Sequence, residues 1–242
     1  MSQAFFRSLV QDASRLYPPG ERFARHFAAG KLGRDPAFRH LLEHGLIPGG
    51  ARVLDIGCGQ GTLAALLAAA QARHARGEWP GDWPPPPALE DYHGIDLGAT
   101  DVGRARSALG NAARFTCGDM RNTPFGEADA VVILDVLHYV DHAAQEDILR
   151  RVRTAIRPGG VLLLRVGAQS DSLRFRYTVW VDRVVMRLRG HRLERLWCRP
   201  LAAWVSLLAS LGFASEARPM SEGTPFANVL LVARPSARAG PA

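Results

Sequence analysis

The chain has 242 residues, of which 30 are lysine or arginine and 23 are aspartate or glutamate, so its formal net charge at pH 7 is +7. Charged residues at 22% and hydrophobic residues at 47% match ordinary globular usage, which excludes a disordered chain and predicts one large domain. The charge points to nucleic acid. Lys31 is the only lysine, however, and an arginine bias can come from coding habits as well as from a binding surface.

Cysteine usage and hydropathy indicate the cellular compartment of the protein. Cys58, Cys117 and Cys198 are odd in number and far apart, which fits neither a disulfide framework nor a paired-cysteine metal site. The first residues lack the apolar run of a signal peptide, and no stretch approaches the roughly 18 apolar residues of a membrane span. The sequence therefore predicts a soluble, cytoplasmic protein without a transmembrane segment, and leaves its oligomeric state open.

Residues 1–48 are predicted to form short helices that break at Pro18-Pro19-Gly20 and at Gly33. Asp35 is placed to cap a further helix that begins at Pro36, because an aspartate side chain accepts from the first helical N–H groups and proline fits the first turn. This part of the chain is predicted to be a helical N-terminal cap.

The pattern changes after residue 51. A short apolar run at 52–56 predicts a strand, the glycine-rich segment 57–61 a tight turn, and the alanine- and leucine-rich stretch 62–72 a helix. The segment GEWPGDWPPPP at 77–87 excludes regular structure because proline lacks the backbone N–H and restricts φ. It is predicted to be an exposed loop.

The rest of the chain alternates strands with helices. Strands are predicted at 91–96, 113–117, 128–134, 161–166, 213–218 and 226–233, and helices at 99–109, 142–156 and 201–211. Such alternation implies an α/β fold with a parallel sheet covered on both faces. The β-branched run at 128–134 fits a strand that is buried on both sides.

The segment after the first strand carries the clearest motif. In an open α/β sheet, ligands bind beyond the carboxyl ends of the strands. Here Asp55 stands two residues before Gly57, and Gly59 and Gly61 follow. The spacing GxGxG differs from the dinucleotide fingerprint GxGxxG, and no Gly-Lys-Ser/Thr follows, which excludes a P-loop. Taken alone, the loop leaves open a nucleotide site or a plain tight turn.

The run Val53-Leu54-Asp55-Ile56-Gly57-Cys58-Gly59-Gln60-Gly61 resembles the nucleotide loop of class I S-adenosylmethionine-dependent methyltransferases. The resemblance implies a Rossmann-like, doubly wound, mostly parallel seven-stranded sheet with helices on both faces and a helical N-terminal cap. It also implies S-adenosyl-L-methionine as cofactor, held by Asp55, Gly57, Cys58, Gly59 and Gly61.

The resemblance continues after the later strands. Asp96 and Leu97 stand where the family binds the ribose hydroxyls, and a carboxylate suits two vicinal donors. Asp119 and Met120 follow the third strand, where the family addresses adenine, and Asp135 follows the fourth, where it holds the methionine moiety. Residues 157–160, Arg-Pro-Gly-Gly, resemble the family's turn into the fifth strand.

Simpler interpretations stand beside these assignments. Asp55 could brace the loop or cap the helix, and Asp96 would occupy the same position in an NAD enzyme. Cys58 could be a nucleophile, although a small residue between two glycines is better explained by packing. Cys117 is interpreted as a residue that fills its strand.

The candidate catalytic residues are His138 and Tyr139, just beyond the fourth strand, in a segment that borders the methyl group in related enzymes. An imidazole titrates near neutrality and could take a phenolic or carbon-acid proton. The alternative is that His138 packs against the cofactor or caps a helix. No convincing cluster of acidic ligands predicts a metal.

The motifs of several acceptor classes are absent. No Asn/Asp-Pro-Pro-aromatic signature of nucleic-acid amine methyltransferases follows the fourth strand, and no Pro-Cys pair marks a cytosine-C5 enzyme. In this fold, additions usually build the acceptor pocket, here 1–48 and 167–200. Within 171–190 an amphipathic helix is predicted, either as a plain cover or as a lid whose arginines meet an anionic partner: a carboxylate, an acyl carrier protein or a membrane surface.

The whole chain is predicted to be one methyltransferase domain, with a cofactor-binding core at 49–166 and a closing helix and strands at 201–234. The layout of the C-terminal half, including Arg199-Pro200-Leu201 and residues 220–226, is similar to methyltransferases of bacterial aryl-polyene and polyketide-type pigment pathways. These resemblances imply methyl transfer to oxygen or carbon of a small aromatic or acyl-type acceptor, in free form or on an acyl carrier protein.

Two rival functions stay open. One is an RNA methyltransferase, and the other is a non-catalytic S-adenosylmethionine-binding partner protein. The segment 150–199 carries thirteen arginines against three acidic residues, so most of the excess charge lies in and just before the acceptor-side addition. This placement makes nucleic acid the less favoured partner and directs the charge toward the rim of the acceptor pocket.

Overall fold

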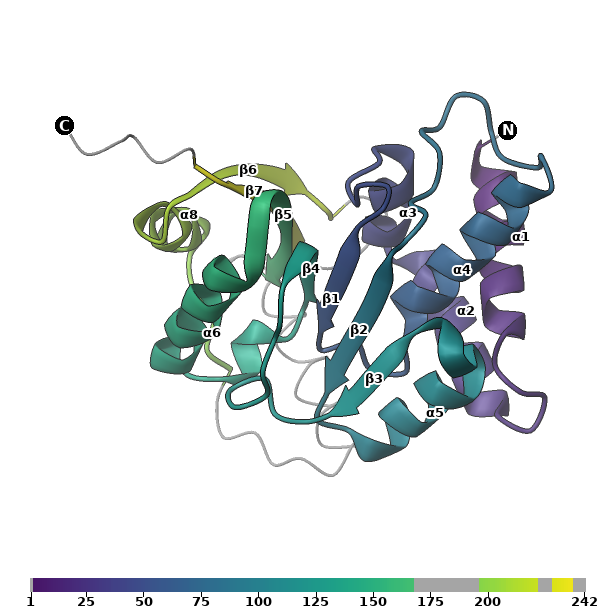
Figure 1. Ribbon diagram of the computed structural model, residues 1–242, viewed down its shortest axis with the longest axis horizontal. Helices are drawn as coiled ribbons and strands as arrows, with labels where there is room; N and C mark the ends of the chain where they lie inside the picture. Colours follow the sequence, from purple (N-terminus) through teal and green to yellow (C-terminus); the bar gives the residue numbers. More distant parts are fainter. Residues whose placement is uncertain (1, 168–195, 222–227, 237–242) are drawn as a thin grey trace. The chain divides into compact units, whose positions relative to one another are not determined.

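The structure is a computed structural model that describes residues 2–167, 196–221 and 228–236. Within these residues, helices surround a seven-stranded mixed sheet with the strand order β3-β2-β1-β4-β5-β7-β6 (Figure 1). The strands are β1 (Arg52–Ile56), β2 (Asp91–Asp96), β3 (Arg114–Cys117), β4 (Ala128–Leu134), β5 (Ile156–Gly167), β6 (Phe213–Pro219) and β7 (Asn228–Pro235). The predicted seven-stranded α/β sheet is confirmed.

Two compact units divide the chain. Unit 1 comprises residues 1–124 and 128–130, and unit 2 comprises 125–127 and 131–242, so that β4 begins in unit 1 and continues in unit 2. The single domain expected from the sequence stays a prediction.

In unit 1, β1 pairs in parallel with β2, and β2 with β3, so the carboxyl ends of three strands share one edge. Helix α4 (Thr62–Ala75) follows β1, and α5 (Ala99–Leu109) follows β2. Nearly every residue of α4 from 62 to 70 is buried, since the helix is apolar all round and packs against α1. This packing holds the start of α4, where the glycine-rich segment ends.

Three helices precede the sheet, as predicted: α1 (Ser2–Arg15), α2 (Arg22–Arg34) and α3 (Pro36–Glu43). The break expected at Gly33 is wrong, because α2 continues to Arg34. The helix ends instead at Asp35, which the following Pro36 pushes into extended backbone with φ −96° and ψ 111°. The Asp35 side chain then caps α3 by accepting from the Ala37 N–H at 3.1 Å, as the sequence predicts.

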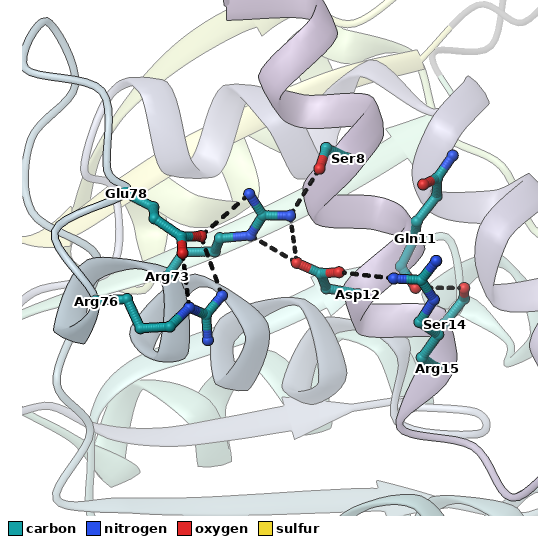
Figure 2. A network of polar contacts seen from close by, with 8 residues as sticks. All are labelled: Ser8, Gln11, Asp12, Ser14, Arg15, Arg73, Arg76 and Glu78. Carbon is teal, nitrogen blue, oxygen red and sulfur yellow. Dashed lines mark hydrogen bonds and ion pairs between the residues drawn. The ribbon is translucent and has the colours of Figure 1, made fainter.

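A polar network ties α1 to the C-terminal end of α4 (Figure 2). The Arg73 guanidinium donates to the Asp12 carboxylate at 2.6 Å and to the Ser8 hydroxyl at 2.6 Å, and it also lies 3.3 Å from the Glu78 carboxylate. The Arg73 side chain is only 18% exposed. Because charged hydrogen bonds gain strength away from water, this network fixes α1 along α4.

The proline-rich loop at 77–87 lacks regular structure, as predicted, but the expectation that it is exposed is wrong in part. Trp83 is buried, and its ring packs edge-to-face on that of Phe5 with the ring centroids 5.6 Å apart. The ring centroids of Trp79 and Phe5 are 5.4 Å apart. Aromatic rings bury large apolar areas in such contacts. The two tryptophans therefore anchor the loop on α1.

In unit 2, β5 and β6 each pair antiparallel with β7. Strand β5 begins already at Ile156, so the expected turn at 157–160 lies inside the strand, where Gly159 adopts φ +80°. A glycine allows this local reversal at no steric cost, which keeps the strand continuous. The center of β5, from Val161 to Leu164, is fully buried.

Helices α6 (His142–Ala155) and α8 (Leu201–Ser210) complete unit 2, with the Asp141 side chain capping α6 through the Ala144 N–H at 2.8 Å. No helix in the described ranges is both long and apolar enough to cross a membrane. The amphipathic helix expected within 171–190 and the first two residues of the strand expected at 226–233 lie outside the described residues.

Candidate cofactor and catalytic sites

The glycine-rich segment turns sharply between β1 and α4. Gly57, Gly59 and Gly61 all have positive φ, at 80°, 53° and 75°, and the Gly61 N–H donates to the Cys58 carbonyl at 2.9 Å. A Cβ on Gly61 would lie 3.1 Å from the Phe115 ring, whereas one on Gly59 would have no heavy atom within 4 Å. Gly61 is thus packed, and Gly59 leaves open space beside the backbone.

Asp96, at the end of β2, connects this loop to the next one. Its carboxylate accepts from the Gly59 N–H at 2.8 Å and from the Gly98 N–H at 2.8 Å. A carboxylate can accept about four hydrogen bonds, so both oxygens retain acceptor capacity. Leu97 beside it is 58% exposed, which places an apolar surface next to the charge.

Asp119 follows β3, and its segment also meets Asp96, because the Gly118 N–H donates to the Asp96 carbonyl at 2.9 Å. The Arg121 side chain binds the Asp119 carboxylate through Nε at 2.9 Å and a terminal nitrogen at 2.5 Å, which lowers the pKa of Asp119. Met120 is half-buried. The structure therefore brings the segments after β1, β2 and β3 together at Asp96.

Asp55 faces away from this open space, into the protein. Its carboxylate is buried and accepts from the Tyr92 hydroxyl at 2.5 Å. Burial raises the pKa of Asp55 from 3.8 to about 7, since a carboxylate away from water is disfavoured. The geometry matches the loop-bracing interpretation, and direct cofactor contact by Asp55 stays a prediction.

The packing interpretation of Cys58 agrees with its surroundings. Its sulfur occupies the space above Gly94, where a Cβ would lie only 2.8 Å away, and burial raises the pKa of the Cys58 thiol. A protonated, enclosed thiol is a poor nucleophile. The interpretation of Cys117 is wrong: it is exposed, because it stands at the end of β3, where the strand leaves the core.

In unit 2, Asp135 follows β4 in an unusual backbone conformation. It is the one non-glycine residue with positive φ, at 59°, within the described part of the chain. Both carboxylate oxygens accept from the Arg165 guanidinium, with Oδ1 at 2.8 Å from Nε. Arg165 is 1% exposed and lies near the carboxyl end of β5. The buried arginine fixes the direction of the Asp135 side chain.

His138 and Tyr139 lie in a short 3-10 turn, η2 (Leu137–Tyr139), with their rings 4.2 Å apart. Burial lowers the pKa of His138 from 6.5 to about 4, against the opposing effect of the Asp135 charge. The imidazole is therefore neutral at pH 7, which is the form that accepts a proton. Its low pKa also makes it a weak base.

One buried glutamine holds this turn. The Gln145 side-chain nitrogen donates to the carbonyls of Leu137 and Val140 at 3.1 Å and of Trp197 at 2.7 Å, and its oxygen accepts from Arg199 at 2.8 Å. The Trp197 N–H in turn donates to the His138 carbonyl at 2.9 Å. The end of the segment 167–200 is thus bound directly to the turn that carries His138.

Several of these residues were not among the predicted site residues. Arg165 had a signal, a single charge inside the apolar run VLLLRVG, which in a buried strand requires a partner. Gln145 and Tyr92 had none, because their roles depend on which distant segments pack beside them.

A hollow of about 500 Å³ lies at the other end of β2 and β3. It is lined by residues 89–92 and 110–114, among which the Arg114 side chain donates to the Asp91 carboxylate at 2.8 Å. It lies away from the carboxyl ends of these strands. Among the described residues, no three or more histidine, cysteine or acidic side chains gather as a metal site would require.

The family model for a methyltransferase domain matches residues 23–216. A carboxy-S-adenosyl-L-methionine synthase from Chromohalobacter salexigens is 29% identical over 48% of this chain and 39% of its own length. Human N-acetylserotonin methyltransferase, solved with S-adenosylmethionine, has a TM-score of 0.60 at 17% identity, over 90% of this chain and 56% of its own. The mitomycin 7-O-methyltransferase has a TM-score of 0.59 at 22% identity, over 89% of this chain and 58% of its own.

The chain belongs to the methyltransferase domain family, and its fold is the Rossmann-like fold of class I methyltransferases. S-adenosyl-L-methionine, with which the human enzyme was solved, is the cofactor that the sequence predicts for this chain. The chain spans about two fifths of the synthase and just over half of the human enzyme.

The residues present in unit 1 fit this cofactor. The space beside Gly59, the Asp96 carboxylate with remaining acceptor capacity and the exposed Leu97 side chain provide room, a partner for two hydroxyls and an apolar surface. The predicted site residues are divided between the two units. Unit 2 contains Asp135, His138 and Tyr139. Unit 1 contains the others, namely Asp55, Gly57, Cys58, Gly59, Gly61, Asp96, Leu97, Asp119 and Met120. That the two groups form one site stays a prediction.

Proposed function

We propose that this protein transfers a methyl group from S-adenosylmethionine to an oxygen or carbon atom of a small aromatic or acyl-type molecule. The observation that carries the proposal is the junction at Asp96, where a carboxylate binds the open glycine loop through the Gly59 N–H and stands beside exposed Leu97. When bound, the cofactor supplies a methyl group already activated on a sulfonium.

The residues of the chain then have positioning and proton-transfer roles. Asp96 would accept the two ribose hydroxyls, and Gly59 would let the ligand approach the backbone. Asp119, kept ionised by Arg121, would accept from the adenine amine. The Asp135 carboxylate, directed by Arg165, would hold the methionine moiety. Alignment of the acceptor with the methyl group can account for most of the rate enhancement, since the donor is already reactive.

His138 is the proposed base for a hydroxyl or carbon acid. Its neutral form at pH 7 supports this role, and its low pKa limits the proton affinity. Tyr139, with its ring against that of His138, is the second candidate. The likeness to N-acetylserotonin and mitomycin 7-O-methyltransferases supports oxygen as the first acceptor atom to test.

The finer parts of the proposal concern acceptor and setting. We include acyl chains on a carrier protein and an aryl-polyene type of pathway, which rest on the layout around Arg199-Pro200-Leu201 and 220–226. Of the latter segment, 222–226 lie outside the described residues. A cytoplasmic setting is supported by three cysteines that form no disulfide.

Transfer of a labelled methyl group to phenolic acids, free fatty acids, carrier-bound acyl chains and RNA tests the acceptor class. We expect product with one of the first three. Product with RNA alone, or binding of the cofactor without any product, would overturn the proposal in favour of the corresponding rival.

Two variants test the residue roles. Asp96→Ala should weaken cofactor binding in calorimetry by about tenfold or more, because it loses charged hydrogen bonds.

His138→Ala should reduce turnover and leave cofactor affinity nearly intact. Unchanged affinity in the first variant, or undiminished turnover in the second, would contradict the role assigned to that residue.

A further inference from the structure

The residue between the last two loop glycines, Gln60, is bound on both sides by the N-terminal helical segment. The Tyr17 hydroxyl donates to the Gln60 carbonyl at 3.0 Å, and the Gln60 side-chain nitrogen donates to the Ala24 carbonyl at 2.7 Å. Tyr17 is fully buried, and Gln60 is 2% exposed. Two separate hydrogen bonds thus join the glycine loop to Tyr17, which lies between α1 and α2, and to Ala24 in the first turn of α2.

These bonds satisfy polar groups that the loop cannot satisfy alone. The Gln60 carbonyl precedes Gly61, the N-cap of α4, and therefore lies outside the hydrogen-bond ladder of that helix. A buried carbonyl without a partner costs about 1 to 3 kcal/mol. Undocking of the helices would leave the Gln60 carbonyl without the Tyr17 hydroxyl, so the loop conformation depends on residues 17–24.

The same segment also contacts helix α5, which follows β2. Arg104 on α5 lies 3.4 Å from the Glu21 carboxylate, and its guanidinium carbon lies 4.8 Å from the center of the Phe23 ring. Helix α5 begins directly after Asp96, Leu97 and Gly98. Residues 17–24 therefore contact both the glycine loop, at Gln60, and helix α5, which begins directly after the proposed ribose-binding segment.

We propose that Tyr17 and Gln60 are positioning residues for the cofactor loop, and that docking of helices α1 and α2 is coupled to S-adenosylmethionine binding. A ligand that binds only the docked loop conformation stabilises docking by the same free energy that docking adds to binding. The N-terminal helices then act on the cofactor as well as on an acceptor. This inference rests on the cofactor and is independent of the acceptor.

The sharpest test is Tyr17→Phe, which removes one hydroxyl and keeps the buried ring. We expect this variant to bind S-adenosylhomocysteine about five- to tenfold more weakly than the wild type in calorimetry, as one buried hydrogen bond warrants. The matched control is Ser14→Ala, which removes one α1 hydroxyl that bonds within the helix itself, to the Gln11 carbonyl at 2.8 Å. Its affinity should stay within about twofold of the wild-type value.

Hydrogen exchange gives a readout that loss of stability alone would not produce. In the wild type, S-adenosylhomocysteine should slow exchange in the loop 57–61 and also in α1 and α2. In Gln60→Ala, saturating ligand should protect the loop and no longer protect the helices. Loss of coupling with retained loop protection separates a positioning role from general destabilisation.

Wild-type affinity in Tyr17→Phe, or equal helix protection with and without ligand in the wild-type protein, would overturn the inference. If Gln60→Ala fails to fold, Tyr17→Phe alone decides the question. A wild-type protein that folds and binds no S-adenosylhomocysteine would instead overturn the cofactor assignment, so the two failures are distinguishable.

Discussion

Two aspartates that follow strands of this sheet each bind an arginine with both carboxylate oxygens, and the two arginines differ in their exposure to solvent. Asp119, after β3, pairs with Arg121, two residues further along the chain, and the Arg121 side chain is 58% exposed. Asp135, after β4, pairs with Arg165, thirty residues away, and the Arg165 side chain is 1% exposed. Both aspartates were predicted to bind the cofactor.

The difference shows how much each pair contributes to the fold. An exposed pair gains little, because water solvates both charges nearly as well as the partner does. A buried pair depends on both members, since removal of one leaves the other charge in a low-dielectric interior. We expect the cofactor segment of unit 1 to tolerate charge changes that unit 2 does not.

The largest effect should come from Asp135→Ala. It leaves the Arg165 charge buried, and we expect the free energy of unfolding to fall by about 3 to 5 kcal/mol, measured by urea denaturation. Asp135→Asn keeps a residue that accepts positive φ and separates the backbone contribution from the charge. The double variant Asp135→Ala with Arg165→Met should recover part of the loss, and a double variant as unstable as the single one would contradict this account.

The next effect is a dependence of stability on pH, which should have opposite signs for His138 in unit 2 and Asp55 in unit 1. The pKa of His138 is lowered to about 4, so its contribution is fully present above pH 6.5 and declines as pH falls toward 4. The pKa of Asp55 is raised to about 7, so its contribution is present below pH 3.8 and is lost as pH rises through 7. Each of these two pH-dependent contributions to the free energy of unfolding should be on the order of 3 kcal/mol.

Urea unfolding between pH 4 and 8 separates these contributions. His138→Leu should remove the loss of stability on the acid side, and Asp55→Asn should remove the loss toward pH 7 and above. An unchanged pH profile in either variant would show that the corresponding group keeps its ordinary pKa in the folded state.

A smaller loss of about 2 kcal/mol is expected for Gln145→Leu, because the carbonyls of Leu137, Val140 and Trp197 lose a shared donor. Faster hydrogen exchange should be confined to the turn 137–140 and the segment after 196. The matched control is Gln71→Leu in unit 1, which loses one bond to the Pro86 carbonyl at 2.8 Å on a half-buried side chain. Equal effects of the two variants would contradict the central role of Gln145.

The smallest effect is expected for Arg121→Ala, below about 1 kcal/mol in the free energy of unfolding, because the pair with Asp119 is exposed. Added salt should change the stability of the wild type and of this variant alike. A loss comparable to that of Asp135→Ala would abolish the contrast between the two pairs.

Much of the fold could be predicted because its signals are local. The strand at 52–56, the turn at 57–61 and the cap at Asp35 each depend on neighbouring residues, and all three are confirmed. The break at Gly33 was predicted wrongly because a glycine inside a helix is only a weak signal, whereas Pro36 acts on the residue before it. The sequence predicts an exposed loop at 77–87, and the burial of Trp83 could not be predicted because its partner Phe5 comes from a distant helix.

The amino-acid sequence by itself determined the order of the elements, the glycine loop and the carboxylates at the strand ends, because strand periodicity and glycine conformation act over a few residues. Only the tertiary structure decided what those carboxylates contact: Tyr92 for Asp55, backbone N–H groups for Asp96, and buried Arg165 for Asp135. It also decided that Tyr17 binds the loop at Gln60. These partners lie tens of residues away, and a buried polar group selects its partner by proximity in the fold.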